Sequence, residues 1–465
     1  MRGNATGPAA PAKEEGRCDL AIVNGKVADV IGNRISQKNV GIRGDKICCV
    51  TSGEIDASAV IDAAGLLVSP GFVDFHSHVD GNPYSAECLV RQGGTTTIGG
   101  ERNLNSHVFR RIEQDGFLIN QGFSISHSFV LRNAVGVSDN RPATEQEIRA
   151  MADLAARFLD HGAFGICFGL ELIPGTSFEE ILKLSAVAKS YERPILVHLR
   201  KDGWEALSCF DEILQAAALT GVSVQILQLL YMVGIGGAMS GALDIIEKAR
   251  AEGLDITADS GLYNAFSVCI GTGVFDKGWE KEYSGASAQD ILISSGVHVG
   301  EYCNEEMFQH LRESYPETLV SAFVCDKDAI EMPLKKDYVY ISTNAADGPH
   351  YMNVGAPEVS GAFPRLLGRH VRERKNLPLI EAIKKITILP ARRYGLTQIG
   401  SIETGQNADI VIFNPDTIID KADFPDRGRP DAPPEGIEYV LVNGDIVVKG
   451  TELTENRHSG RLLKK

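Results

Sequence analysis

The stretch Ser69-Pro70-Gly71-Phe72-Val73-Asp74-Phe75-His76-Ser77-His78 decides how the fold is interpreted. Its apolar run directly after Pro-Gly predicts a short buried strand that ends in polar residues. His76 and His78 stand at alternate positions, so in an extended chain both side chains point to one face and can share a metal ion. The alternative is a pair of hydrogen-bonded histidines without a metal.

Downstream of this stretch, short apolar runs alternate with longer amphipathic segments. Buried strands that alternate with helices indicate a parallel sheet, and about eight such units form a (β/α)8 barrel. The predicted strands are 68–76, 95–100, 123–130, 164–170, 195–199, 222–227, 254–259 and 338–343. The long stretch before the last strand, at about 265–336, is predicted to be an insert or a lid.

Both ends of the chain carry the same hairpin signal, an apolar run followed by Asn-Gly, at 22–25 and 441–444. The two signals are either unrelated hairpins or parts of one small β domain, and we favour the single domain. The predicted fold is therefore α/β, a (β/α)8 TIM barrel with a small β-sandwich domain assembled from both termini. The predicted boundaries are a flexible tail at 1–17, a composite β domain at 18–68 and 397–465, and a barrel at 69–396.

Composition narrows the class of protein. The 465 residues include 46 Lys and Arg against 61 Asp and Glu, and this acidic balance disfavours binding to nucleic acid or to an anionic membrane. Hydrophobic residues make up 43%, which excludes disorder along the whole chain. The nine cysteines form no CxxC pair, which favours a reduced, cytoplasmic protein over a zinc ribbon. We expect a small-molecule substrate and no membrane partner, and the oligomeric state stays open.

A third histidine ends another predicted strand. His198 lies near the end of 195–199, and the carboxyl ends of parallel barrel strands meet at one face. We therefore expect His198 to face the same axis as His76 and His78. Three imidazoles are a common ligand set for catalytic zinc, which keeps a further position open for water or substrate. Such an ion lowers the pKa of water toward 7 and polarises a carbonyl group.

Together these residues resemble the amidohydrolase superfamily, and within it the N-acyl-D-amino acid deacylases (D-aminoacylases). The resemblance extends from about residue 19 to the C-terminus. It implies both the barrel and the split β domain, and it places the three histidines on metal-ligand positions. The stretches that carry it are PGFVDFHSH at 70–78, QGGTTT at 92–97, GAFG at 162–165, VHLR at 197–200, GAFPRLLGR at 361–369 and LPARRYGL at 389–396.

The chain departs from this family at three positions. The family has a cysteine after strand two, where Glu101 would supply a carboxylate instead or would only pair with Arg102. On strand six Gln228 replaces a histidine, which argues against a second metal. The family's last strand delivers a water-orienting aspartate. Alignment without a gap places Asn344 there, which cannot act as a base, and a short insertion places Asp347 there.

The resemblance implies roles for four further residues. His127 matches a family histidine after strand three and is a candidate for substrate binding. Tyr263 matches a tyrosine that would stabilise the oxyanion, and its alternative is a packed residue at the base of a loop. Arg200 and Arg365 would bind a substrate carboxylate, since a guanidinium does so bidentately, or would form internal ion pairs.

The sequence thus predicts a metal-dependent hydrolase of a C–N amide bond, in an N-acyl-amino acid or a cyclic amide. One divalent ion, zinc, would be held by the three histidines with Glu101 as a fourth ligand. Asp347 would act as base and then acid, unless Asn344 takes that position, and Tyr263 would stabilise the oxyanion. Two alternatives stay open. The ion could serve as a Lewis acid in a lyase, isomerase or cyclase, or the chain could be a non-catalytic relative.

Overall fold

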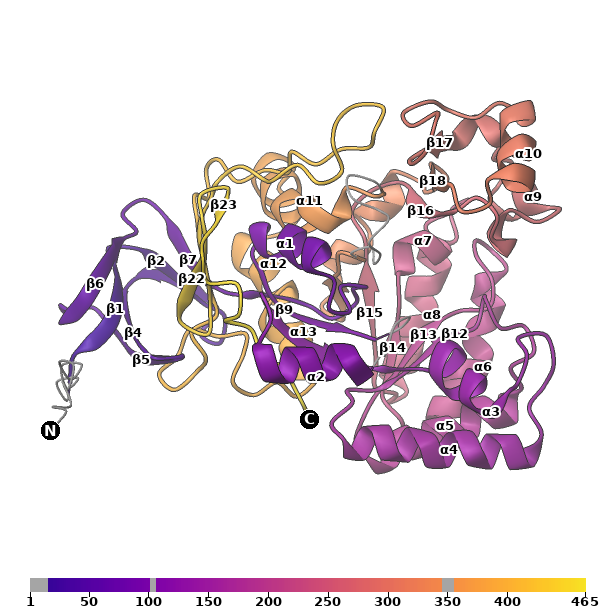
Figure 1. Ribbon diagram of the computed structural model, residues 1–465, viewed down its shortest axis with the longest axis horizontal. Coiled ribbons are helices and arrows are strands. Elements are labelled where there is room, and N and C mark those ends of the chain that lie inside the picture. The colour runs from indigo at the N-terminus through magenta and orange to yellow at the C-terminus, as the bar shows by residue number, and fades with distance from the viewer. Residues whose placement is uncertain (1–15, 101–105, 345–354) are drawn as a thin grey trace, which may run out of the picture.

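The computed structural model describes residues 16–100, 106–344 and 355–465. A small all-β end and a larger α/β part are arranged along the long axis of the molecule (Figure 1). The predicted site residues Glu101 and Asp347 lie outside the described residues.

The α/β part is built on parallel strands in two sheets. A three-stranded sheet has the order β10-β9-β8 and a six-stranded sheet the order β11-β12-β13-β14-β15-β19, with every pairing parallel. Most of these strand residues are apolar and buried, as expected where helices cover a parallel sheet. The α/β class is confirmed. The strands are β8 (Phe72–Asp74), β9 (Gly94–Gly99), β10 (Asn120–Phe123), β11 (Ile125–Ser126), β12 (Ile166–Gly169), β13 (Ile195–His198), β14 (Val224–Ile226), β15 (Ile256–Ser260) and β19 (Val339–Ile341).

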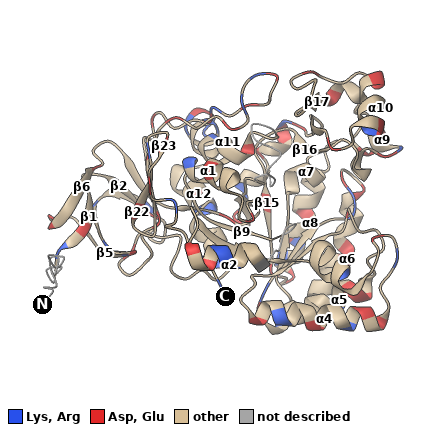
Figure 2. Cartoon of the chain, viewed as in Figure 1, with Lys and Arg blue, Asp and Glu red and all other residues tan. Residues whose placement is uncertain are grey.

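Helices follow most of these strands, and several begin at side-chain caps that the sequence supplies. Thr144 and Glu147 form a reciprocal capping box at the start of α4, and Ser177 caps α5. Acidic and basic residues are interspersed along α4, whereas α10 begins with acidic residues (Figure 2). The principal helices are α1 (Pro83–Arg91), α2 (Ser106–Asp115), α4 (Glu145–Asp160), α5 (Phe178–Ser190), α6 (Ala206–Thr220), α7 (Leu229–Val233), α8 (Met239–Ala251), α10 (Glu305–Ser314), α11 (Glu358–Arg365), α12 (Leu379–Lys385) and α13 (Ile388–Arg393).

The all-β end combines strands from both ends of the chain. Its seven-stranded sheet has the order β23-β22-β21-β20-β7-β2-β3, and β20 pairs with β7 antiparallel, with Ile412 opposite Val68. A four-stranded sheet, β5-β4-β1-β6, packs beside it around a shared apolar core. The strands are β1 (Cys18–Val23), β2 (Lys26–Asp29), β3 (Arg34–Gln37), β4 (Asn39–Arg43), β5 (Lys46–Thr51), β6 (Ala57–Asp62), β7 (Leu67–Pro70), β20 (Ile410–Phe413), β21 (Ile437–Val442), β22 (Asp445–Lys449) and β23 (Glu452–Leu453).

The two predicted Asn-Gly hairpins have different outcomes. Asn443 and Gly444, both with positive φ, join the paired strands β21 and β22, so this hairpin is confirmed. The hairpin predicted at 22–25 is wrong, because β1 and β2 lie in different sheets. The side chains of Asn39 and Asp62 bond Asn24 and hold this turn as a crossing between the sheets.

Two predicted strands are also divided. The stretch 68–76 changes sheets at Gly71, where a Cβ atom would lie 2.1 Å from the Thr95 hydroxyl, so only glycine allows this close crossing. The stretch 123–130 ends as a strand at Ser126, whose hydroxyl accepts a hydrogen bond from the Phe129 amide and caps a helical turn. At Gly71 a contact with the neighbouring strand β9 overrides the apolar pattern, and at Ser126 a side-chain cap three residues away does so.

The stretch predicted as an insert has its own secondary structure. An antiparallel sheet has the order β16-β18-β17, formed by Phe266–Cys269, Leu319–Ala322 and Ile291–Ile293. Phe275, Trp279 and Phe308 pack against one another beneath α9 (Trp279–Glu282) and α10. In the described part of the chain, no helix is both long enough and apolar enough to span a membrane.

Candidate metal and catalytic site

Three histidines from two strand ends meet inside the α/β part. His76 and His78 follow β8, and His198 is the last residue of β13. The ring centroid of His76 lies 5.8 Å from that of His78 and 5.3 Å from that of His198. All three side chains are buried. The structure therefore brings together the three histidines that the sequence singles out.

A carboxylate that the sequence analysis missed positions His76. Oδ1 of Asp259, on β15, lies 3.1 Å from Nδ1 of His76, and both side chains are fully buried. Asp259 also accepts hydrogen bonds from the amide of Gln228 at 3.1 Å and the hydroxyl of Ser342 at 2.7 Å. A carboxylate on Nδ1 fixes the ring and its tautomer, so that Nε2 is the ligand nitrogen. The available signal was its place at the end of a predicted strand.

The imidazole nitrogens of the three histidines suit a divalent metal ion such as zinc. Imidazole nitrogens are common zinc ligands, and a carboxylate behind one of them is the usual outer-shell arrangement. Among the described histidines, cysteines and acids, only cysteines 18, 48 and 49 bring three ligand atoms within 4.8 Å of one another. The histidine nitrogens are therefore more widely spaced, and binding of an ion at the histidines requires the rings to move closer together.

Acidic groups surround His198. A carboxylate oxygen of Glu171 lies 3.9 Å from Nδ1 of His198. Burial raises the pKa of nearby Asp202 to about 7, and its carboxylate accepts a 2.5 Å hydrogen bond from the hydroxyl of Tyr283. Since Tyr283 follows α9, the insert helps to position an acid near the histidines.

Two more buried acids lie on the side of His76. Burial raises the pKa of Asp74 to about 7, and Asp74 accepts hydrogen bonds from the hydroxyl and the amide of Thr343. Burial also raises the pKa of Glu358, in the first turn of α11, well above its ordinary value. A Cβ atom at Gly261 would lie 2.2 Å from the Tyr231 hydroxyl and 2.5 Å from the Glu358 carboxylate, so both groups close on this backbone.

Asn344 lies just beyond β19, with a left-handed φ of 44°. Its amide donates a 3.1 Å hydrogen bond to the carbonyl of His76, which ties the end of β19 to the end of β8. Because Asp347 and Glu101 lie outside the described residues, their roles stay predictions.

Tyr263 and Arg365 contact each other in an ion cluster. The guanidinium of Arg365 lies 4.2 Å from the centre of the Tyr263 ring. Both side chains bond the buried carboxylate of Asp420, at 2.8 Å from Arg365 and 3.3 Å from the Tyr263 hydroxyl, and Arg369 bonds it at 2.6 Å. Burial and the charge of Asp420 raise the pKa of Tyr263. Their roles toward an oxyanion and a substrate carboxylate stay predictions.

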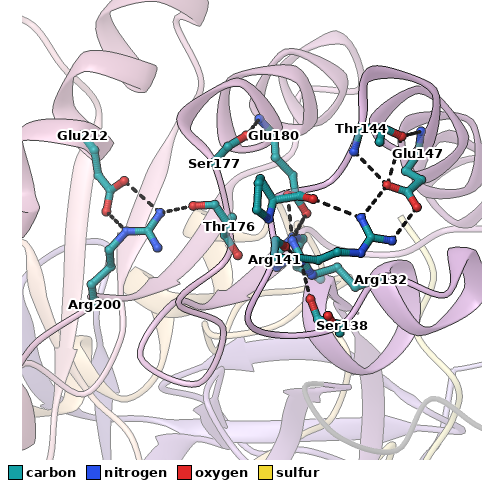
Figure 3. Close-up of polar contacts among 12 residues, drawn as sticks. Arg132, Ser138, Arg141, Thr144, Glu147, Thr176, Ser177, Glu180, Arg200 and Glu212 are labelled. Atoms are coloured by element: carbon teal, nitrogen blue, oxygen red, sulfur yellow. Dashed lines mark hydrogen bonds and ion pairs between the residues drawn. The ribbon is translucent and has the colours of Figure 1, made fainter.

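His127 belongs to a buried ionic network. Its Nε2 lies 2.6 Å from a carboxylate oxygen of Glu180. Nη1 of Arg132 donates to both oxygens of that carboxylate, at 2.8 and 2.7 Å (Figure 3). Burial lowers the pKa of His127. Arg132 also donates to the carbonyls of Ser138 and Arg141 at 2.7 and 2.6 Å. These contacts fix His127 inside the fold, and its role in substrate binding stays a prediction.

Arg200 likewise has internal partners. Its guanidinium binds Glu212 bidentately, at 2.6 and 3.1 Å, and donates to the carbonyl of Thr176 at 2.6 Å (Figure 3). The guanidinium charge is therefore compensated within the protein. Its assignment to a substrate carboxylate stays a prediction, and the ion pair with Glu212 is the contact that the structure shows.

A parallel α/β fold with histidines converging from its strand ends is the arrangement that the resemblance to amidohydrolases implies. A model of the amidohydrolase family matches residues 345–448. Among curated relatives, N-acyl-D-glutamate deacylase of Alcaligenes xylosoxydans xylosoxydans is 26% identical over 97% of both chains. The D-aminoacylase of the same organism is 27% identical over 96% of this chain and 97% of its own.

Solved structures of deacylases are also similar to this chain. A crystal structure of D-aminoacylase superposes with a TM-score of 0.85 at 26% identity, covering 96% of this chain and all (100%) of its own. N-acyl-D-glutamate deacylase from Bordetella bronchiseptica, complexed with zinc and a phosphonate inhibitor, superposes with a TM-score of 0.84 at 24% identity, covering 97% and 100%. The chain is therefore similar to D-aminoacylases over nearly its whole length, and the resemblance predicted from the sequence is confirmed.

Proposed function

We propose that this protein is a metal-dependent hydrolase of C–N amide bonds other than peptide bonds. The observation that carries the proposal is the convergence of His76, His78 and His198, with Asp259 fixed behind His76. The relatives support it, since their names describe deacylases of N-acyl-D-amino acids.

His76, His78 and His198 would hold one divalent ion, with Glu101 as the fourth protein ligand. We propose zinc, because imidazoles suit it and because the Bordetella bronchiseptica deacylase was crystallised with zinc. Such an ion supplies Lewis-acid polarisation of the amide carbonyl and a nucleophile from water at neutral pH. A D-aminoacylase is described with a binuclear metal centre, whereas Gln228 in this chain favours a single ion.

The chain's own residues would orient the reactants and move the proton. Asp259 holds the imidazole of His76 in one tautomer. We assign the general base to Asp347, because the amide side chain of Asn344 cannot accept and return a proton in this way. Asp347 would take the proton of the attacking water and return it to the leaving amine. Tyr263 would donate a hydrogen bond to the oxyanion after turning from Asp420.

The charges near the histidines favour a substrate that carries no free carboxylate close to the scissile bond. Arg200 and Arg365 are already paired with Glu212 and Asp420. Asp74 and Glu358 are buried on the side of His76, and Asp202 is half-buried. Because the guanidinium groups of Arg200 and Arg365 are already compensated, a cyclic amide or a neutral N-acyl amine is favoured over an N-acyl-amino acid, whose carboxylate would need a cation.

A substrate panel in oxygen-18 water tests the proposal. Zinc-loaded protein is assayed with N-acyl-D- and N-acyl-L-amino acids, neutral N-acyl amines and cyclic amides. We expect hydrolysis, with one solvent oxygen in the product carboxylate. The His76→Ala variant should lose both the bound ion and turnover, whereas His161→Ala, which changes an exposed histidine, should retain both.

The remaining outcomes separate the alternatives. Turnover without solvent oxygen would identify a Lewis-acid lyase, isomerase or cyclase. Absence of bound metal, together with no turnover of any substrate, would identify a non-catalytic relative. Undiminished turnover in His76→Ala would contradict the proposed site.

We also propose the finer fold and the location. The amide of Asn344 donates to the carbonyl of His76, and the amide of Phe164, just before β12, donates to the carbonyl of Phe123 at the end of β10. These bonds support closure of the two parallel sheets into one (β/α)8 barrel. The paired ends of the chain support a composite β-sandwich domain. None of the nine cysteines forms a disulfide bond, which supports a reduced, cytoplasmic location.

A further inference from the structure

Three cysteines form a cluster in the all-β end of the molecule. Cys18 begins β1, and Cys48 and Cys49 lie in β5. One sulfur atom from each lies within 4.8 Å of the other two, and the sulfurs of Cys18 and Cys48 are 2.7 Å apart. Cys18 is buried and the other two are partly exposed, so the cluster is reachable from solvent.

A β-bulge explains why two consecutive cysteines take part. In the β4–β5 pair, Gly41 lies opposite Cys49 and Ile42 opposite Ile47, which leaves Cys48 as the extra residue. Neighbouring residues of a regular strand point to opposite faces, whereas a bulge re-aims one side chain. Cys48 and Cys49 can therefore both approach Cys18.

Gly41 makes room for the three sulfur atoms. A Cβ atom at this position would lie 2.7 Å from the sulfurs of Cys18 and Cys49 and 3.1 Å from that of Cys48. Any side chain here would push the sulfurs apart. The bulge and the glycine thus bring three sulfur atoms together next to Gly41.

We propose that Cys18, Cys48 and Cys49 bind a thiophilic d10 metal ion, Zn²⁺ or Cu⁺, at a site separate from the histidines. Thiolates are the preferred ligands of both ions. Three thiolates complete a trigonal site for Cu⁺, or leave one position for water on Zn²⁺. Each thiol that binds loses its proton to solvent as its sulfur–metal bond forms, so no electron transfer is involved.

The thiol state of the cysteines and the position of the cluster in the molecule both suit metal binding. None of the nine cysteines forms a disulfide bond, so no disulfide occupies the three sulfur atoms of the cluster. Because a thiol must lose its proton to bind a metal ion, metal affinity should rise with pH. The cluster lies in the four-stranded sheet at one end of the molecule, away from β13 and β15 (Figure 1).

Metal titration of the full-length chain tests the site. The His76→Ala background removes the histidine site, and the protein is reduced and stripped of metal before titration with Zn²⁺ or Cu⁺ against a chromophoric chelator. We expect one equivalent to bind per chain. Cys18→Ser, Cys48→Ser and Cys49→Ser should each weaken binding at least tenfold, whereas Cys209→Ser, in α6, should leave it unchanged. Gly41→Ala should also weaken binding, although all three thiols are retained.

A second measurement needs no variant. In wild-type protein, Zn²⁺ or Cu⁺ should protect cysteines 18, 48 and 49 from alkylation, as detected by mass spectrometry of their peptides, and should not protect Cys209. Two results would overturn the proposal: equal alkylation with and without metal, or a Cys18–Cys48 disulfide in protein isolated under reducing conditions. Neither result bears on the histidine site, so failure here is distinct from failure of the amide-hydrolase proposal.

Discussion

Nδ1 of His76 and Oδ1 of Asp259 meet 3.1 Å apart between fully buried side chains that are 183 positions apart in the sequence. This contact joins the end of β8 to β15 across the α/β part. It orients one of the two histidines that follow β8, because the carboxylate fixes which ring nitrogen is left to face the site. The contact therefore supports His76 as a ligand of the proposed metal ion.

Asp259→Asn should weaken metal binding without removing a ligand. Loss of the outer-shell carboxylate typically lowers metal affinity about 10- to 100-fold, because the imidazole loses its fixed orientation and some basicity. Zinc affinity, measured by competition in a Cys18→Ser background, checks this. Asp276→Asn, an exposed aspartate in the insert, is the matched control. Equal affinities for the two variants would show that Asp259 does not position a ligand.

Asp347→Asn should lower kcat by at least about 100-fold if Asp347 is the general base, because general acid–base catalysis contributes about that much or more. Zinc content should stay unchanged, which separates loss of the base from loss of the ion. Asn344→Ala should have a much smaller effect on kcat, since its structural contact is made by the backbone amide. If Asn344→Ala is instead the more damaging change, the roles of the two residues are reversed.

Glu180→Gln should destabilise the fold by about 3–5 kcal/mol, because it leaves the guanidinium of Arg132 buried without a compensating charge. The free energy of unfolding in urea measures the loss. Glu145→Gln makes the same change in an exposed pair with Arg149 and should alter stability by less than about 0.5 kcal/mol. Similar values for both variants would mean that the buried network contributes little to stability.

His370 should make the protein less stable in acid. Burial, together with the charges of Arg365 and Arg374, lowers the pKa of His370 to about 4. Between pH 6.5 and 4 the unfolded chain therefore binds a proton at this histidine that the folded chain does not. Stability is lost as the pH falls through this range, by up to about 3 kcal/mol from this group.

The variant His370→Gln removes this titration. Its free energy of unfolding should depend less steeply on pH between 6.5 and 4 than that of the wild type, and His161→Gln should retain the wild-type slope. The two stability curves should become parallel above pH 6.5, where His370 is neutral in both states. A His370→Gln curve that stays parallel to the wild type down to pH 4 would contradict the assignment.

The sequence determined much of the architecture because its signals there are local. Strands and helices follow from apolar periodicity, and the ends of parallel strands must meet at one edge. From this reasoning we expected His198 to lie with His76 and His78, and the ring of His198 does lie next to that of His76. From the similar signals at the two termini we expected one β domain, and one sheet does contain strands from both ends of the chain.

Where the chain crosses between sheets, the local pattern was misleading. Apolar continuity predicted one strand over 68–76, yet close packing of Gly71 against Thr95 divides it. Asn-Gly predicted a hairpin at 22–25, yet bonds to Asn39 and Asp62 direct the turn into another sheet. Contacts with distant residues decided both cases.

By itself, then, the sequence determined the α/β class, the amidohydrolase resemblance and the three histidines, since each depends on residue types at short spacings. Only the tertiary structure decided that Asp259 supports His76, that Glu212 and Asp420 pair with Arg200 and Arg365, and that three cysteines without a CxxC spacing meet. The physical reason is that these partners come from separate elements. Strand register, a bulge and side-chain packing set their separation, and no local pattern in the chain specifies it.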